Sequence, residues 1–532
     1  MSELSHRAVS ALHGKRVGIA ALMLSVGILV SRVLGYVREA VIAYQQGAGV
    51  ATDAYNAAFL LPDLMNYFLA GGTLSITFIP LFGACLAQDR ESVGWKLFST
   101  IATVMGGVLL AGIVVAEVFT EYFIHLLFPD FGPAATQLTV EMTRIVLPCQ
   151  FFHYIGGLIL ATLMAQGRFA AATLAPLVYN GSIIFFGLLL GSSMGMAGFA
   201  VGALIGAVIG PFGLSLYLAR DRLQYRPHFA WREVEFRRYV LLTIPLMLGV
   251  SLVTLDEWFG RILGSAMETG TISWLNYGRR LMLVPIAVIG QAASQAALPF
   301  LSRLAGEGKR DELAMMLTRS LHYVILLALT AGGLMVALAE PTVTLVYQRG
   351  AFTALDSARA TAVLELFALG IASWGVQMVA ARGFYAEQNT LTPMALSTVV
   401  TLGSVPLYMT LGDLMGASGL ALAATIGITT QALVTVLAYK RSNRAMSLRS
   451  LLDSTLRGLV IAGGGSLVAA LMCRWMLLLP SWGVSLDALL RVTVGGVLGG
   501  AVAAGLARVL VPSDWSRLSS RVRAKLVRKR GR

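Results

Sequence analysis

Residues Phe98–Ala116 read FSTIATVMGGVLLAGIVVA and contain no charged side chain. A helix needs about 20 mostly apolar residues to cross the hydrocarbon core of a bilayer, and this run is close to that length. The bilayer interior offers no hydrogen-bond partners to backbone N–H and C=O groups, so a spanning segment is either a helix or a strand of a closed barrel. Barrel strands alternate apolar and polar residues, and this run does not. It therefore predicts a transmembrane helix.

The composition of the whole chain agrees with that prediction. Of its 532 residues, 57% are hydrophobic and only 13% are charged, a balance that soluble domains of ordinary composition do not show. Three further long runs carry no charge: Ile19–Ser31, Leu459–Leu471 and Val492–Leu506. We therefore expect an all-α integral membrane protein.

The apolar segments predict about 14 transmembrane helices. Their approximate ranges are 17–43, 54–83, 95–119, 137–165, 170–191, 193–219, 239–264, 272–302, 315–339, 357–387, 391–411, 415–439, 452–478 and 485–511. Lys15 and Arg16 precede the first of them, and no clear small-residue cleavage site follows. This helix is therefore expected to remain in the protein rather than to be removed as a signal peptide.

Positive charge gathers in alternate connections between these helices. The basic connections are Lys15/Arg16, Arg90/Lys96, Arg168, Arg220–Arg238, Arg303–Arg319, Arg382, Lys440–Arg449 and Arg517–Arg532, and only Arg349 and Arg359 break the alternation. Because cytoplasmic loops collect Lys and Arg, we expect both chain ends in the cytoplasm. The basic tail is expected to lie on anionic lipid headgroups, and we do not expect a nucleic acid partner.

The chain also repeats itself at an offset of 219 residues. Residues Thr52, Tyr55 and Arg90 correspond in this way to Thr271, Trp274 and Lys309. Two parallel six-helix repeats are the plan of transporters in which two bundles surround a central cavity. We expect bundles at 1–219 and 239–440, an amphipathic cytoplasmic linker at 220–238, two extra transmembrane helices at 441–511 and a basic cytoplasmic tail at 512–532.

The sequence shows no enzymatic or nucleotide-binding motif. It contains no Walker A loop, dinucleotide fingerprint or zinc-protease helix. Its three cysteines, Cys85, Cys149 and Cys473, match no metal-ligand spacing. We therefore expect neither an enzyme nor a cofactor or metal, and we expect any transport to be driven by a Na⁺ or H⁺ gradient, the membrane potential or a partner.

Charged residues inside the expected helices need a reason, because a charge in the membrane is costly. Glu257 and Arg261 are four residues apart and can pair on one helix face. Asp53 either caps the helix that begins beside it or takes part in gating. Under the repeat offset Glu257 corresponds to Arg38, so Asp256 or Glu257 can instead neutralise an arginine of the first helix and couple transport to an ion.

Three arginines are harder to explain locally. Arg32 and Arg38 lie inside a long apolar helix, and Arg280 lies one turn beyond Asn276. Guanidinium groups match phosphate oxygens bidentately and stay charged at any depth. We expect these arginines to be unpaired and to converge on one cavity that binds a multiply charged, phosphate-bearing anion.

The same residues carry a resemblance to a known family. The stretches SRVLGYVRE (31–39), ATDA (51–54), FIP (78–80), SWLNYGRRL (273–281) and GFYA (383–386) resemble the signature of the MurJ (MviN) family. MurJ proteins are lipid II flippases of the multidrug/oligosaccharidyl-lipid/polysaccharide exporter superfamily. The resemblance covers nearly the whole chain and implies transfer of undecaprenyl-pyrophosphate-linked disaccharide-pentapeptide to the outer leaflet of the bacterial plasma membrane.

The resemblance also implies roles for particular residues. By position, the essential cavity arginines of the family correspond to Arg32, Arg38 and Arg280, and its periplasmic-gate aspartate to Asp53. The sequence departs from the family pattern where Asn66 and Tyr67 replace arginines and Gly71 replaces a glutamate. Arg279 stands where an aspartate is common, which adds a further candidate for substrate binding.

These observations predict a flippase for lipid II, with membrane lipids and the cell-wall synthesis machinery as further partners. The alternative in the same class is a flippase for another polyprenyl-linked glycan, such as an O-antigen or exopolysaccharide unit. A cation-coupled drug exporter is expected to have an acidic cavity, and the three arginines argue against that class. A polyprenyl-phosphate glycosyltransferase would need large extracytoplasmic loops, and a non-transporting scaffold would not need buried arginines.

Overall fold

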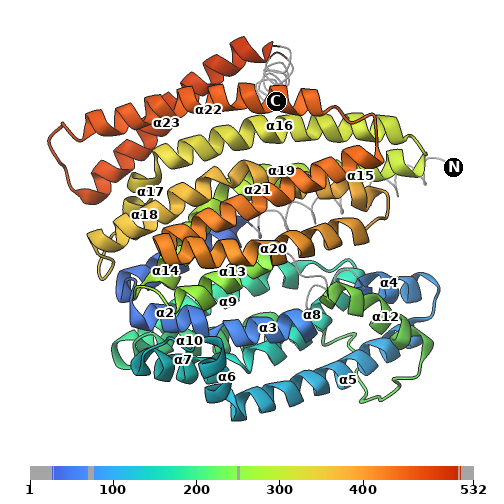
Figure 1. Cartoon of the computed structure of the whole chain (residues 1–532). Coiled ribbons are helices and arrows are strands. Elements are labelled where there is room, and N and C mark those ends of the chain that lie inside the picture. The colour runs from blue at the N-terminus through green and yellow to red at the C-terminus, as the bar shows by residue number, and fades with distance from the viewer. Residues whose placement is uncertain (1–26, 28, 70–76, 249–251, 513–515, 517–532) are drawn as a thin grey trace, which may run out of the picture. The chain divides into compact units, whose positions relative to one another are not determined.

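A computed structural model describes residues 27, 29–69, 77–248, 252–512 and 516 (Figure 1). Every regular element in these residues is a helix, and they contain no strand. This confirms the all-α class that the sequence predicts. The expectations for Gly71, for most of the basic tail and for the first part of the helix 17–43 lie outside the described residues.

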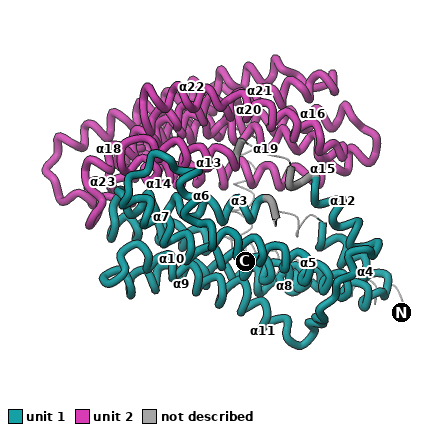
Figure 2. The backbone as a smooth tube through the Cα atoms, turned by 60° about the horizontal axis from the view of Figure 1, so that its bottom comes forward, with its two compact units in different colours: residues 1–249 teal, residues 250–532 magenta. Residues whose placement is uncertain are grey.

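The chain divides into two compact units, residues 1–249 and 250–532 (Figure 2). The division falls later than the linker at 220–238 that the sequence suggested. The helix α12 (Val234–Leu248) contacts α3 and α5 of the first unit, and its Phe236 and Tyr239 are buried in that unit's core. The expected helix 239–264 is therefore shared between α12 in the first unit and α13 (Leu252–Gly264) in the second.

The first unit contains the helical residues 29–46 and the elements that follow them up to α12. These are α2 (Val50–Ala58), α3 (Leu60–Leu69), α4 (Ile79–Ala87), α5 (Glu91–Val118), α6 (Thr120–Leu127), α7 (Pro133–Val146), α8 (Cys149–Ala165), α9 (Ala170–Met194), α10 (Ala197–Ala207), the π-helical η2 (Val208–Leu214) and α11 (Ser215–Ala219). Glycines bring α9 and α10 together, because a Cβ at Gly206 would lie 2.9 Å from the carbonyl oxygen of Tyr179. Small residues allow this close approach of helices in membranes.

The second unit begins with α13 and continues to the end of the described chain. Its other elements are α14 (Thr271–Pro285), the π-helical η3 (Ile286–Gln291), α15 (Ala292–Gly306), α16 (Arg310–Ala337), α17 (Ala339–Tyr347), α18 (Ala354–Leu369), α19 (Ile371–Ala386), α20 (Leu391–Met415), α21 (Ala417–Ser442), α22 (Leu448–Met476) and α23 (Val484–Leu510).

The internal repeat is visible in the helix boundaries. The helices α5 and α16 both have 28 residues, and they start at Glu91 and Arg310, which are 310 − 91 = 219 positions apart. The short helices α6 and α17 start at Thr120 and Ala339, again 339 − 120 = 219 positions apart. The two units therefore use the same helix order, as the sequence repeat predicts.

Several segments expected as single helices are broken. The segment 272–302 consists of α14, η3 and α15, with the π-helical turn directly after Pro285. The segment 357–387 bends by 41° between α18 and α19, at Gly370. Proline lacks the backbone N–H that would continue the hydrogen-bond ladder, and glycine adds backbone freedom, so breaks at these residues have a local cause.

Ten helices in the described residues are long and apolar enough to cross a membrane, or eleven if the bent pair α18–α19 is one span. The chain is thus a multi-pass membrane protein. The expected helices 17–43, 54–83 and 239–264 are not among the ten, and each of them runs through residues outside the described part. The count of 14 stays a prediction.

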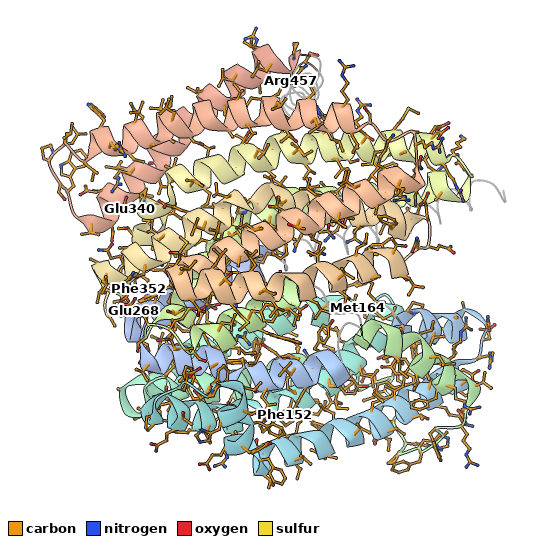
Figure 3. The ribbon with its side chains drawn as sticks, in the orientation of Figure 1. Phe152, Met164, Glu268, Glu340, Phe352 and Arg457 are labelled. Atoms are coloured by element: carbon orange, nitrogen blue, oxygen red, sulfur yellow. The ribbon has the colours of Figure 1, made fainter. Side chains whose placement is uncertain are left out.

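The two extra helices, α22 and α23, pack as a pair onto α16 and α17. They approach each other through glycine, since a Cβ at Gly465 would lie 2.9 Å from the carbonyl oxygen of Gly499. Arg491 of α23 makes a two-pronged ion pair with Glu340 of α17. At the other end of α23, Arg457 of α22 donates to the carbonyl oxygen of Leu510 at 2.6 Å. Figure 3 marks Arg457 and Glu340 at these two ends of the pair.

The expected amphipathic linker lies along α5. Residues 223–230 form no regular helix. Ser99 of α5 accepts a hydrogen bond from the backbone N–H of Arg226 at 3.2 Å and lies 3.4 Å from the carbonyl oxygen of Gln224. The ring of Tyr225 lies edge-on to Phe98, with centroids 6.5 Å apart.

Candidate functional site

Arg38 is held by two side chains of the first unit. Its Nη2 donates to the carboxylate of Glu39 at 2.6 Å, and its Nη1 donates to Oδ1 of Asn180 on α9 at 3.0 Å. The amide nitrogen of Asn180 donates to the carbonyl oxygen of Pro176 at 3.0 Å, which turns the amide oxygen toward Arg38. The arrangement fixes the direction of the guanidinium before any ligand arrives.

The ion pair of Arg38 with Glu39 lies inside the unit. The exposed fractions of the two side chains are 16% and 5%. Arg38 is therefore not the unpaired cation that the sequence analysis expected, because its charge is compensated by the adjacent residue. Its Nε is buried and has no hydrogen-bond partner among the described residues. A role of Arg38 in substrate binding stays a prediction.

Two other expected site residues lie on neighbouring segments of the first unit. Arg32 is half-buried on the same helix as Arg38. Asp53 lies in the first turn of α2 and is 5% exposed. The residue that caps α2 is Gly49, without a side-chain hydrogen bond, so Asp53 does not cap this helix. Its carboxylate still lies at the positive end of the helix dipole. In α3, Asn66 is exposed and Tyr67 half-buried.

A second cluster lies in the other unit, around Asp256 of α13. Its carboxylate forms an ion pair with Arg279 of α14 and accepts a hydrogen bond from the hydroxyl of Tyr408 on α20 at 2.5 Å. Arg279 also stacks over the ring of Phe367 on α18, 5.2 Å from its centroid. Asp256 is 2% exposed, so this cluster joins four helices through one buried carboxylate.

The neighbouring acid, Glu257, pairs locally. Its Oε1 lies 2.7 Å from Nη2 of Arg261, four residues further along α13. This is the pair that the four-residue spacing allowed. The side chain of Glu257 is 43% exposed, against 3% for Asp256. A pairing of either acid with an arginine of the first helix would join the two units, and it stays a prediction.

Arg279 and Arg280 are neighbours in sequence but point in different directions. Successive residues of a helix are rotated by about 100° around its axis. Arg279 is held by Asp256, and Arg280 is half-buried as well. Of the two, only Arg279 belongs to the Asp256 cluster, so the two arginines are not equivalent candidates for substrate binding.

Sequence reasoning missed Asn180 and Tyr408. Asn180 hydrogen-bonds Arg38 across 142 positions of sequence, and Tyr408 reaches Asp256 across 152. Each follows a proline within the same helix, Pro176 and Pro406. Those prolines mark irregular helices, but nothing in the sequence tells which side chains they bring together.

The arrangement of the helices identifies the class of protein first. The structure aligns with a solved structure titled lipid II flippase MurJ, inward closed conformation, at TM-score 0.76 and 21% identity, over 92% of this chain and 100% of that one. It also aligns with an inward-facing multidrug resistance MATE family transporter at TM-score 0.65 and 17% identity, over 80% and 98% of the two chains. The protein thus has the fold of this class of multi-pass membrane transporters.

Sequence comparison then gives the family. A family model described as lipid II flippase MurJ matches residues 42–493. A probable lipid II flippase MurJ of Vibrio cholerae is 29% identical over 520 residues, which cover 93% of this chain and 96% of the relative. That of Bdellovibrio bacteriovorus is 27% identical, over 86% and 88%. The chain belongs to the lipid II flippase MurJ family.

Proposed function

We propose that this protein moves lipid II from the inner to the outer leaflet of the bacterial plasma membrane, for cell-wall synthesis. The observation that carries the proposal is the family match over residues 42–493, supported by relatives that align over nearly their whole length. The same comparisons favour lipid II over another polyprenyl-linked glycan.

The chemistry of lipid II gives the buried arginines a purpose. Its pyrophosphate carries negative charge through a medium of low dielectric constant, where fixed cations stabilise it strongly. Arg38 is already oriented by Glu39 and Asn180, so it would lose little conformational entropy on binding. We propose that Arg32, Arg38 and Arg280 contact the pyrophosphate, with Asp53 at the extracytoplasmic gate, while the polyprenyl tail stays among lipids.

We propose that transport is coupled to an ion gradient or to the membrane potential. The geometry indicates which of Asp256 and Glu257 is better suited to this coupling. Asp256 is fully engaged by Arg279 and Tyr408, so protonating it would leave a buried guanidinium uncompensated. Glu257 is more exposed, and its ion pair within the described residues is with Arg261. We therefore propose Glu257 as the group that exchanges its partner during transport, and Asp256 as a fixed point of the second unit.

Two experiments together test the function. The gene is expressed in a strain depleted of its own lipid II flippase, and growth is scored. The purified protein is placed in vesicles with labelled lipid II, and the appearance of the headgroup on the other side is measured with and without Na⁺ and pH gradients. Growth together with lipid II transfer is the expected result. Transfer of an O-antigen precursor without transfer of lipid II would replace the proposed substrate.

A further inference from the structure

A polar cavity of about 310 Å³ lies between α16 and the start of α22. Arg319, His322, Ser447 and Ser450 line it. Ser454 gives its one hydroxyl proton to the carbonyl oxygen of Ser450 at 2.6 Å. Its Oγ, 2.5 Å from Nδ1 of His322, is then the acceptor of that contact, which fixes the imidazole in place.

Arg319 gives this cavity its charge. It makes no ion pair in the part of the chain that the structure describes. It is the tenth residue of α16, about 14 Å from the helix start, and a long basic side chain at that depth reaches back to the headgroup level. The cavity therefore presents an uncompensated cation beside two hydroxyls at the basic end of both helices.

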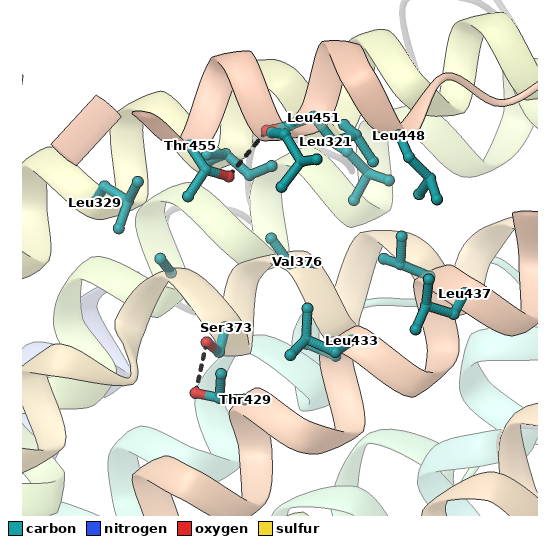
Figure 4. A pocket seen from close by; sticks show the side chains of 15 residues that line it. Leu321, Leu329, Ser373, Val376, Thr429, Leu433, Leu437, Leu448, Leu451 and Thr455 are labelled. Carbon is teal, nitrogen blue, oxygen red and sulfur yellow. Dashed lines mark hydrogen bonds between the residues drawn. The ribbon is translucent and has the colours of Figure 1, made fainter. Parts of the chain in front are cut away.

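An apolar cavity of about 340 Å³ begins within one helical turn of the polar one. Figure 4 shows the side chains that line the apolar cavity. Leu321 lines the apolar cavity and its neighbour His322 the polar one, as Leu448 and Ser447 do on the other side. The hydroxyls in the apolar cavity are satisfied internally, for example Ser373 and Thr429 by each other at 2.9 Å. It therefore offers an almost purely hydrocarbon lining.

The apolar cavity opens at an exposed surface rich in leucine. Leu433, Leu437 and Leu452 line it and are each more than half exposed. Its walls come from α16, α19, α21 and α22, and no described residue of α23 lines it. A lipid chain can therefore enter from the side without crossing the headgroup layer.

We propose that the two cavities together form a loading site for the lipid substrate in the cytoplasmic leaflet, with the pyrophosphate at Arg319 and the hydroxyls of Ser447 and Ser450, and the first part of the polyprenyl chain in the apolar cavity. The juxtaposition carries this inference, because a cationic polar cavity joined to an apolar one fits an amphiphile with an anionic head and a long chain. The inference rests on the proposed function for the choice of polyprenyl pyrophosphate. A membrane phospholipid has the same chemistry and is the alternative source.

Binding of undecaprenyl pyrophosphate to the purified full-length protein in detergent tests the site, with dissociation constants measured by native mass spectrometry. We expect Arg319→Gln to weaken binding about tenfold through the loss of charge-assisted hydrogen bonds. Leu452→Trp, which narrows the apolar cavity from its exposed side, should weaken it as well. Arg303→Gln is the matched control, because Arg303 is an exposed arginine at the basic end of α15 that pairs with Glu307 outside both cavities.

The outcomes separate the loading site from the proposed function. Equal binding by wild type, Arg319→Gln and Leu452→Trp, with lipid II transfer intact, would overturn the loading site alone. No binding by the wild type would count against the proposed function as well. Displacement by phosphatidylglycerol at equal concentration would show a general phospholipid site and overturn the assignment. Displacement by inorganic pyrophosphate alone would also overturn the assignment, since the polyprenyl chain would then contribute nothing to binding.

Discussion

Arg38 shows how a single charge is prepared inside the membrane. Glu39 compensates it, and Asn180 fixes its direction through a chain that starts at the carbonyl group of Pro176. A compensated arginine is cheaper to keep in a low-dielectric interior than an isolated one. Under the proposed function, an arriving pyrophosphate would compete with Glu39 for the guanidinium, so that binding and release would involve an exchange of partners.

The first prediction concerns these arginines. Arg32→Ala, Arg38→Ala and Arg280→Ala should each abolish lipid II transfer while the protein still inserts, and Arg38→Lys should retain part of it, because lysine keeps the charge without the bidentate fork. Asn180→Ala should give an intermediate rate, since it removes orientation but not charge. Vesicle transfer rates measure this, with Arg303→Ala as the control. Normal transfer by all three alanine variants would refute the anion-binding role.

The second prediction concerns the buried carboxylate of the other unit. Asp256→Ala leaves Arg279 without its counter-charge, which should lower the free energy of unfolding by about 3 kcal/mol. Tyr408→Phe removes one hydrogen bond and should cost about 1 kcal/mol. Thermal unfolding in detergent measures both. Asp453→Ala is the control, because its pair with Arg457 is exposed and should matter little. Equal losses for Asp256→Ala and Asp453→Ala would contradict the assignment.

At the scale of helices, glycine takes part both in the breaks within helices and in the close packing between them. Proline and glycine break the segments 272–302 and 357–387, and glycine also brings neighbouring helices into backbone contact. A membrane offers no hydrophobic drive between helices, so packing of small residues holds them together. The α22–α23 pair is one such contact, at Gly465 and Gly499.

The third prediction tests that contact. Gly465→Leu places a side chain against the backbone of Gly499, where a Cβ alone would already be 2.9 Å from the carbonyl oxygen. We expect α22 and α23 to separate, with lower thermal stability and slower lipid II transfer. Gly463→Leu is a matched control two residues away, because nothing lies within 4 Å of a Cβ there. Wild-type behaviour of both variants would mean that the pair does not depend on this approach.

The fourth prediction concerns the pair as a whole. Removing α22 and α23 should leave a protein that still inserts and folds, since Leu326 and Leu329 of α16, which lie against Gly458 of α22, can meet lipid instead. Transfer of lipid II should be lost, because α22 supplies walls of both cavities beside α16. Vesicle assays with lipid II and with a short-chain analogue measure this. Full transfer of lipid II by a stable truncated protein would remove the proposed role of these helices.

At the scale of the whole molecule, the two units repeat one helix order with matched boundaries, as α5 and α16 show. The even number of helices that the sequence predicts for each repeat would give both units the same orientation in the membrane. Lys and Arg concentrate in alternate connections, and this pattern predicts which side of the membrane those connections face. Inner-membrane localisation and cytoplasmic chain ends are the proposals that follow.

The fifth prediction tests this topology. In a background without Cys85, Cys149 and Cys473, a cysteine at Ser192 should react with a membrane-impermeant maleimide in intact spheroplasts. A cysteine at Arg222 should react only after the membrane is opened. Both positions are exposed and lie at opposite ends of the one candidate span between them, Ala197–Ala219. The reverse labelling pattern would invert the orientation, and labelling of both sites in intact cells would contradict the helix count between them.

The amino-acid sequence by itself determined the class of protein, the repeat and the family. Apolar runs, loop charges and the family signature are local patterns, and the physics of the bilayer acts on them locally. The sequence also singled out Arg38, Arg279 and Asp256 as charged residues inside expected membrane helices, where a charge is costly. Only the tertiary structure decided how they are paired, because the choice between Glu39, Asn180 and Tyr408 depends on contacts across as many as 152 positions. The loading site belongs to this second kind, since its two cavities exist only where α16 and α22 meet.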